Sequence, residues 1–176
     1  MLENDVSKYD LSSLVHCCTA GEALNPEIFN RWLAATGHKI YEGFGQTECT
    51  LCIATIYPWT EPTPGAIGLP VPGYDVHVLG EDGESCPRGV TGEICIRVLS
   101  RMRKTCGLLD SYNFSAEDTK KSLHDGFYHT GDTAYRDEKG MFRYVGRNDD
   151  VIKSSGYRIG PFEIESVMLE HPAVLE

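Results

Sequence analysis

The sequence of 176 residues has few basic residues and no long hydrophobic run. Its 16 Lys and Arg face 26 Asp and Glu, which gives a net charge of −10 at pH 7. Because no basic stripe exists to neutralise phosphates, this pattern excludes a nucleic-acid-binding or anionic-membrane surface. No apolar run approaches the ~18 residues of a membrane-spanning helix. The polar residues 1–5 resemble neither a secretory nor a transit peptide, so we expect a cytoplasmic protein.

Several catalytic and metal-binding signatures are also missing. The seven cysteines are odd in number and scattered, which favours reduced thiols over a disulfide framework. Cys49 and Cys52 match C-x-x-C, but no second pair stands at zinc-finger spacing. The six histidines show no ligand-like spacing, and none is assigned a catalytic role. His129, beside a Gly-Asp turn, is interpreted as shaping that turn. No G-x-x-x-x-G-K-[ST] phosphate loop occurs.

The composition itself is that of an ordinary globular protein. It is 41% hydrophobic and 24% charged, so a packed core is expected and wholesale disorder is not. The length suits one domain, or one domain plus the beginning of another.

The first third of the chain predicts a parallel strand–helix–strand unit. Residues 14–18 form a buried apolar run, and residues 38–41 form a second one. Between them, Asn25 is a typical helix cap, Pro26 suits the first helical position, and the helix closes near Gly37. A short crossover of this kind makes the two strands parallel neighbours. Ligands bind open α/β sheets beyond the carboxyl ends of such strands.

The stretch 41–48, Tyr-Glu-Gly-Phe-Gly-Gln-Thr-Glu, follows directly and is interpreted as a glycine-bearing loop at that edge. Gly43 and Gly45 let the backbone approach a ligand closely. Thr47 and Glu48 offer two hard oxygen ligands, which suit Mg²⁺ held against phosphates. A nicotinamide-dependent dehydrogenase is disfavoured, because the third glycine of the dinucleotide fingerprint is missing.

After residue 57 the pattern changes to a Pro- and Gly-rich connector and then to short strands. Two hairpins are predicted, around turns at 80–83 and 136–140, with a short helix capped by Ser115 between them. A polar linker at 146–150 leads to a third hairpin and to a helix that begins at Pro161. We expect the apolar residues of this helix to form its inner face: Ile164, Val167 and Met168.

The expected fold is α+β overall: a parallel βαβ piece of a larger sheet, then a small antiparallel β-barrel, then the start of a small α+β C-terminal domain. The predicted boundaries are 1–66 for the α/β part, 67–147 for the barrel, and 148–176 for the hinge and the beginning of the small domain.

Five motifs stand in one order: residues 19–24, 41–48, 128–132, 146–150 and 153–159. The set closely resembles the adenylate-forming superfamily, which includes acyl-CoA synthetases, firefly luciferase and the adenylation domains of peptide synthetases. The closing runs 160–165 and 170–174 look most like the medium-chain acyl-CoA synthetases. The resemblance covers essentially the whole chain from about residue 14.

What the resemblance implies is a two-step ligase reaction. A carboxylic acid attacks the α-phosphate of ATP to give an acyl-adenylate, and coenzyme A then displaces AMP to give the thioester. Negative charge builds in both steps, so cations such as Mg²⁺ and backbone N–H groups supply most of the stabilisation.

The resemblance also implies roles for individual residues. An adenosine pocket would lie between two walls, whose residues are Gly21, Glu22 and Ala23 on one side and Glu42, Gly43, Phe44, Gly45 and Gln46 on the other. Thr47 would touch the α-phosphate and Glu48 would hold Mg²⁺. Asp132 would accept hydrogen bonds from the ribose hydroxyls, Arg147 would approach the ribose and the phosphate, and Arg158 would lie near phosphates.

Further roles concern coenzyme A, the acyl group and domain motion. Asp149 matches the hinge of the small domain, and Ser155, Gly156 and Tyr157 would line the pantetheine tunnel. Acetate-specific relatives carry Trp where this chain has Gly45. An open acyl pocket is therefore expected, for a medium-chain fatty or an aromatic acid.

The family's phosphate-binding loop and catalytic lysine do not occur in the sequence. We therefore expect a fragment that lacks the N- and C-terminal parts of its parent chain and is inactive alone. Two alternatives stay open: an adenylation domain that loads a carrier protein, and a non-catalytic nucleotide-binding module. Simpler interpretations also remain for single residues: turn glycines at Gly43 and Gly45, a turn aspartate at Asp132, a solvated Glu48, and a surface ion pair from Arg147 to Asp149 or Asp150.

Overall fold

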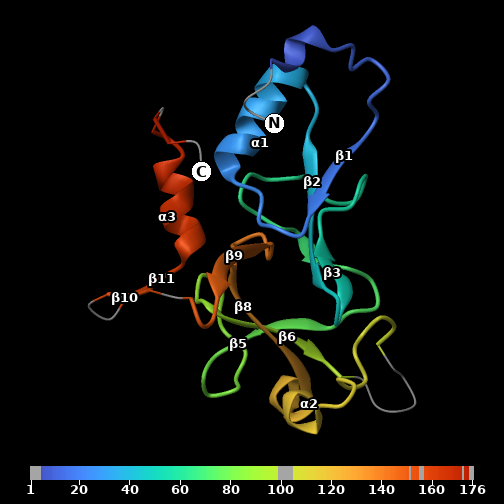
Figure 1. The fold of residues 1–176 in the computed structure, drawn as a ribbon, viewed down its shortest axis with the longest axis vertical. Helices are drawn as coiled ribbons and strands as arrows, with labels where there is room; N and C mark the ends of the chain where they lie inside the picture. The colour runs from blue at the N-terminus through green and yellow to red at the C-terminus, as the bar shows by residue number, and fades with distance from the viewer. Residues whose placement is uncertain (1–4, 99–104, 151, 155–156, 172, 175–176) are drawn as a thin grey trace.

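A mixed sheet and a curled antiparallel sheet form the body of the protein, and a small hairpin with one helix extends to one side (Figure 1). The computed structural model describes residues 5–98, 105–150, 152–154, 157–171 and 173–174. A short 3-10 helix, Val6–Lys8, precedes the first strand. Among the described residues, no helix is both long and apolar enough to cross a membrane.

The mixed sheet has the strand order β1-β2-β3-β4. Its strands are β1 (Cys17–Ala20), β2 (Ile40–Gln46), β3 (Thr50–Ala54) and β4 (Leu69–Pro70). Strands β1 and β2 are parallel, with helix α1 (Pro26–Thr36) between them in sequence, which confirms the predicted crossover unit. The expected buried run at residues 14–18 is wrong in its bounds and its burial, since β1 begins at Cys17 and Val15 is 91% exposed. The Asn25 side chain accepts from the Glu27 N–H at 2.8 Å, and Gly37 ends the helix in the left-handed conformation. Both caps were readable from sequence because capping is a local interaction.

The glycine motif is strand rather than loop, which corrects the sequence interpretation. Strand β2 runs through to Gln46 and pairs antiparallel with β3, with a register shift between Phe44 and Gly45. At this shift the two backbones come very close: a Cβ on Gly45 would lie 1.6 Å from the Thr50 carbonyl oxygen. Gly45 is therefore required by the hairpin itself, whatever ligand the strand faces.

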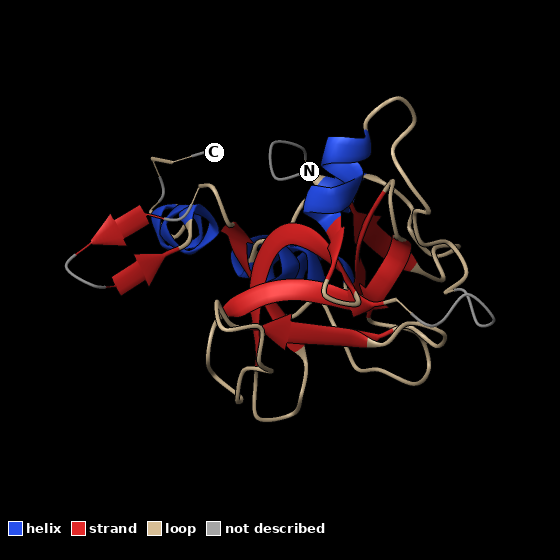
Figure 2. Ribbon diagram, turned by 90° about the horizontal axis from the view of Figure 1, so that it is seen from below, coloured by secondary structure: helices blue, strands red, loops and turns tan. Residues whose placement is uncertain are grey.

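The antiparallel sheet confirms the two predicted hairpins. Its strands are β5 (Val76–Leu79), β6 (Gly92–Arg97), β7 (Leu123–His124), β8 (Phe127–Arg136) and β9 (Phe142–Arg147). The order is β5-β6-β8-β7, and β9 also pairs with β8. Helix α2 (Ala116–Ser122) is capped by Ser115 as expected. The sheet curls strongly, as Figure 2 shows, and forms a half-barrel. The predicted α+β class is confirmed.

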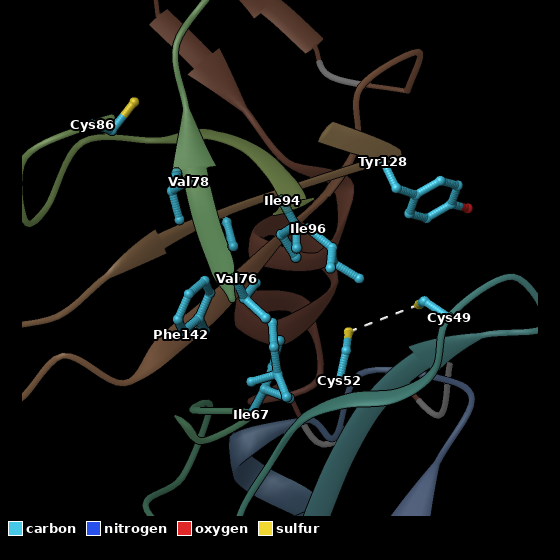
Figure 3. Close-up of a cluster of buried hydrophobic side chains, with 12 residues drawn as sticks. Cys49, Cys52, Ile67, Val76, Val78, Cys86, Ile94, Ile96, Tyr128 and Phe142 are labelled. Atoms are coloured by element: carbon cyan, nitrogen blue, oxygen red, sulfur yellow. Dashed lines mark hydrogen bonds between the residues drawn. The ribbon is translucent and has the colours of Figure 1, made fainter. Parts of the chain in front are cut away.

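The main core fills the space between the two sheets (Figure 3). Its fully buried members include Ile53 of β3, Ile94 and Ile96 of β6, and Phe142 of β9. The thiols of the C-x-x-C pair, Cys49 and Cys52, also belong to this core, with their sulfur atoms 3.8 Å apart. Both behave as small apolar groups, since free cysteines are among the most buried residue types.

The C-terminal unit consists of β10 (Ile152–Ser154), β11 (Tyr157–Ile159) and α3 (Pro161–Met168). Helix α3 packs on β9, where the rings of Phe162 and Tyr144 lie 6.1 Å apart, and Ser166 accepts from the Asn25 amide of the α1 cap at 3.2 Å. The prediction of an inner apolar face is wrong for this chain. Ile164, Val167 and Met168 are 38% to 63% exposed. Helix α3 contacts the body through Phe162 and Ser166 instead.

The close approach at Gly45 gives a first testable prediction. Gly45→Ala should lower the free energy of unfolding by about 1–3 kcal/mol or more, because the new methyl group collides with backbone that cannot rotate away. The measurement is urea denaturation followed by circular dichroism. Gly80→Ala is the matched control, since the atoms nearest its Cβ would belong to side chains rather than backbone: the Asp82 carboxyl at 2.8 Å and the Cys86 sulfur at 3.7 Å. Equal losses in the two variants would contradict the argument.

Candidate functional site

A buried carboxylate joins the two sheets at the end of β2. Asp132 on β8 is 5% exposed. Its Oδ2 accepts from the Gln46 amide at 2.6 Å and from the Arg147 guanidinium at 3.5 Å, and its Oδ1 accepts from the Tyr144 hydroxyl at 2.9 Å. The β8–β9 register places Arg147 directly opposite Asp132. Three of the sequence-predicted site residues therefore meet at one point.

The Gln46 amide is fixed on both of its ends. Its Nε2 also donates to the Thr130 carbonyl at 2.9 Å, and its Oε1 accepts from the Tyr128 hydroxyl at 2.7 Å. Arg147 donates to the same Thr130 carbonyl at 3.0 Å. Because every polar atom of the amide has a partner, its orientation is determined by the surrounding network.

Burial raises the pKa of Asp132 above its usual range, and the donors Tyr144, Arg147 and Gln46 oppose the shift. Each carboxylate oxygen can accept two hydrogen bonds, so Oδ1, which has one protein donor here, keeps an acceptor position. A ligand hydroxyl is the kind of group that can use it.

A second buried carboxylate anchors the loop after β1. In the β1–β2 register Ala20 pairs with Gly43, so the loop that begins at Gly21 runs beside the glycine strand. Glu42 accepts from the Leu24 N–H at 2.9 Å and thereby holds this loop against β2. Burial raises the pKa of Glu42 to about 7, and the hydrogen bond from Leu24 lowers it only in part.

The residues predicted to contact the nucleotide base lie around this contact. Gly21 and Glu22 are exposed and Ala23 is half-buried, all in the loop. On β2, Phe44 lies near Tyr144, with ring centroids 6.4 Å apart. The structure thus brings the two predicted walls together as neighbouring segments of chain.

Thr47 and Glu48 form the turn between β2 and β3. Thr47 is exposed, and Glu48 is half-buried and accepts from the Tyr112 hydroxyl at 3.0 Å. The Leu109 N–H donates to the Glu48 carbonyl at 2.6 Å, which ties the segment after residue 104 to the turn. A hydroxyl and a carboxylate at one turn fit the hard oxygen ligands that Mg²⁺ prefers.

The remaining predicted residues belong to the C-terminal unit. Asp149 lies in a turn after β9, and its carboxylate is 3.4 Å from Arg147 Nε, the surface ion pair considered from sequence. Tyr157 and Arg158 lie on β11, and their side chains are not described. Ser155 and Gly156 fall outside the described residues.

Sequence reasoning missed the tyrosines of the site. Tyr112, Tyr128 and Tyr144 each donate a hydroxyl to a predicted site residue. Tyr128 and Tyr144 lie on β8 and β9, and Tyr112 lies in the segment before α2. The available signal was the residue type alone, since a buried tyrosine usually finds a partner for its hydroxyl.

A cavity of about 770 Å³ lies along the strands of the mixed sheet. Its lining includes His16, Tyr41, Tyr57 and also Glu42 and Gly43. It borders the glycine strand on the side of the Glu42 carboxylate, while Asp132 and Gln46 are not part of its lining.

The structure is that of an α+β protein with a glycine-bearing strand, an adjoining loop held by the Glu42 carboxylate, and a buried Asp–Arg–Gln network. The model of the family described as AMP-binding enzyme matches residues 1–104. The chain belongs to this family, as the motif order predicted.

The chain is 45% identical over all of its 176 residues to the mouse (Mus musculus) protein named acyl-coenzyme A synthetase ACSM3, mitochondrial. The chain spans 30% of the length of that relative.

Solved structures agree with the fold. The anthranilate CoA ligase AuaEII in complex with anthranoyl-AMP superposes with a TM-score of 0.86 at 33% identity, over 97% of this chain and 31% of that one. ATP-bound MatB from Rhodopseudomonas palustris superposes with a TM-score of 0.80 at 32% identity, over 90% of this chain and 30% of that one.

The raised pKa of Glu42 predicts a specific pH dependence. Its folded-state pKa of about 7 exceeds the ordinary 4.5, so its contribution to stability is fully present below pH 4.5 and is lost as the pH rises through 7. Glu42→Gln keeps an acceptor for Leu24 and cannot ionise. Relative to the unmodified chain, this variant should gain up to about 3 kcal/mol across that window.

Urea denaturation at a series of pH values measures this difference. Glu117→Gln, a replacement on the exposed helix α2, controls for removing a carboxyl group from the chain. The range from pH 4 to pH 8 brackets the ionisation of Glu42. If the stability of Glu42→Gln and that of the unmodified chain changed in parallel over this range, the burial of an ionisable carboxyl here would be contradicted.

Proposed function

We propose that the chain supplies the nucleotide-binding part of an ATP-dependent acid:CoA ligase. The enzyme would activate a carboxylic acid as acyl-AMP and transfer the acyl group to coenzyme A. The observation that carries the proposal is the buried Asp132 carboxylate, on which Gln46, Tyr144 and Arg147 converge. Family membership supports it, and so do the names of the relatives, one an acyl-coenzyme A synthetase and one an anthranilate CoA ligase.

In this proposal Asp132 binds the ribose. A diol offers two O–H donors, and a carboxylate accepts both with charge-assisted hydrogen bonds. Oδ1 has an acceptor position left beside Tyr144, and the long 3.5 Å contact from Arg147 is the one most easily exchanged for a ribose hydroxyl at Oδ2. Arg147, 45% exposed, then turns its charge to the α-phosphate.

The base lies between the loop at Gly21, Glu22 and Ala23 and the glycine strand. Thr47 and Glu48 hold the phosphate and metal edge, where Mg²⁺ would neutralise charge that develops on the phosphate oxygens. Tyr112 orients the Glu48 carboxylate for this role through its hydroxyl.

The C-terminal unit, in this proposal, serves the second half-reaction. Asp149 is the hinge of residues 148–176, Arg158 approaches phosphates, and the pantetheine tunnel is lined by Ser155, Gly156 and Tyr157. The turn that carries Asp149 is exposed, which suits a pivot, and rotation about it would break the contacts of α3 with β9 and the Ser166–Asn25 hydrogen bond. The proposed units 1–66 and 67–147 would together form the large domain's share of the site.

The proposed acid is larger than acetate, either a medium-chain fatty acid or an aromatic acid. Gly45 leaves no side chain at the position where acetate-specific relatives carry Trp, while the space that its own Cβ would take is filled by the Thr50 backbone. An acid screen on an enzyme that contains this chain tests the idea by thioester formation. Activation of acetate alone would overturn it.

Two alternatives remain: an adenylation domain that loads a carrier protein, and, for the 176-residue chain alone, a non-catalytic nucleotide-binding module. Free coenzyme A is favoured as acceptor by the relatives' names. We expect the chain alone to be inactive, since no lysine-bearing phosphate loop occurs in it.

The localisation predicted from the sequence stays the cytoplasm, while the mouse relative is named mitochondrial. Cell fractionation separates the two compartments.

Nucleotide binding by the chain itself is the decisive test. Calorimetry should detect binding of AMP and, more tightly, of a non-hydrolysable acyl-adenylate mimic. Asp132→Ala should weaken both by at least tenfold, roughly the loss of one hydrogen bond to a charged group. Glu117→Ala, a carboxylate removed from the exposed face of α2, should bind as the unmodified chain does.

Equal binding by Asp132→Ala and the unmodified chain would refute the ribose role. No binding at millimolar ligand by a folded unmodified chain would leave only a scaffold. Circular dichroism of each variant establishes that the fold is intact.

A further inference from the structure

A cluster of three metal-ligating side chains lies on the antiparallel sheet, outside the proposed nucleotide site. On β6, Ile94 and Ile96 point into the main core, so Glu93 and Cys95 project from the opposite face. His129 on β8 pairs directly with Cys95 across the strands. One ligand atom from each of these three residues lies within 4.8 Å of the other two.

The Glu93 carboxylate is the shared acceptor of the cluster, within reach of both the His129 ring and the Cys95 thiol. His129 Nδ1 lies 2.9 Å from a Glu93 carboxylate oxygen and 3.4 Å from the Cys95 sulfur. If Nδ1 carries its proton, it donates to Glu93 and cannot accept from the thiol. If Nδ1 lacks the proton, it faces the carboxylate as acceptor against acceptor. The other ring nitrogen, Nε2, is buried and has no hydrogen-bond partner among the described residues.

We propose that Glu93, Cys95 and His129 bind a zinc ion. A tetrahedral Zn²⁺ at ~2.0–2.3 Å from N, O and S ligands places those ligand atoms roughly 3.3–3.8 Å apart. The 2.9 Å and 3.4 Å separations come within a few tenths of an ångström of that spacing. A single cation in place of the protons would give all three atoms a partner at once.

The surroundings fit a bound ion. The Gly131 N–H donates to the other Glu93 oxygen at 2.9 Å, which orients the carboxylate as an outer-shell partner does. The His124 ring stacks on His129 at 3.8 Å between centroids. A cavity of about 460 Å³ reaches Glu93, His124 and His129, so a fourth ligand such as water has an entry path.

The donor set selects zinc over magnesium or calcium, because thiolate and imidazole are soft and borderline ligands. Burial also raises the pKa of the Cys95 thiol, so the ion displaces a proton when it binds. Gly131 and Asp132 lie within strand β8, so the Gly-Asp turn expected from the sequence is not formed. Bound zinc would cross-link β6 to β8 at His129, three residues before Asp132. It would thus stabilise the strand that presents Asp132, independently of any nucleotide.

The test uses the chain with three cysteines outside the cluster replaced by serine, so that they cannot compete: Cys17, Cys18 and Cys106. Calorimetry should show one Zn²⁺ per chain. Cys95→Ser and His129→Asn should each weaken binding by roughly 100-fold or more, since even the loss of an outer-shell partner costs 10–100-fold. Cys86→Ser and His38→Asn, the same replacements outside the cluster, should leave zinc binding unchanged.

The proposal would be overturned if Cys95→Ser and His129→Asn bound zinc as tightly as the chain with the intact cluster. It would also be overturned if the chain with the intact cluster bound no zinc. If a variant does not fold by circular dichroism, X-ray absorption at the zinc edge of the intact cluster decides. One sulfur with nitrogen and oxygen neighbours supports this site. No sulfur, or two sulfurs as from Cys49 and Cys52, refutes it.

Discussion

The arrangement of the two sheets depends on one buried carboxylate. An unpaired charge at Asp132 would cost several kcal/mol in a desolvated position, so the strands that reach it must supply donors. Gln46 comes from the end of β2, while Tyr144 and Arg147 come from β9. A shift of the mixed sheet against the half-barrel would leave the Gln46 amide and its partners on β8 unpaired, whereas Tyr144 and Arg147 belong to the same sheet as Asp132 and would move with it. The network therefore fixes the relative position of the sheets more specifically than the apolar core between them, which tolerates small displacements.

Successive side chains of strand β8 point to opposite faces of the sheet, so the strand carries two different clusters of polar residues. Tyr128, Asp132 and Ala134 face the interior between the sheets and are buried. His129 points to the other face, toward Glu93 and Cys95. Gly131 stands between the two sets: its N–H binds Glu93 and its carbonyl accepts from Asn148 at 2.8 Å. The Asp132 network and the His–Cys–Glu cluster thus share one strand without sharing a side chain.

Local signals determined how much of the fold could be predicted. The cap at Asn25, the end at Gly37 and both hairpins were predicted correctly because each depends on a few adjacent residues. The glycine motif was interpreted as a loop because glycine is disfavoured in strands, yet the approach of Thr50 requires it. The site tyrosines were missed because pairing register and bulges, such as that between Thr133 and Ala134, decide which side chains meet.

Arg147 makes the carboxylate site and the following turn interdependent. Its guanidinium lies 3.5 Å from Asp132 and 3.4 Å from Asp149, so one cation is shared between a buried and an exposed acid. The exposed pair alone is worth ~0–1 kcal/mol, whereas the contact with buried Asp132 gains from the lower effective dielectric. A ligand that satisfies Asp132 removes that advantage and frees Arg147 for a phosphate or for Asp149. In the proposed function, occupancy of the site and the conformation of the turn toward β10 would therefore be coupled through the Arg147 side chain.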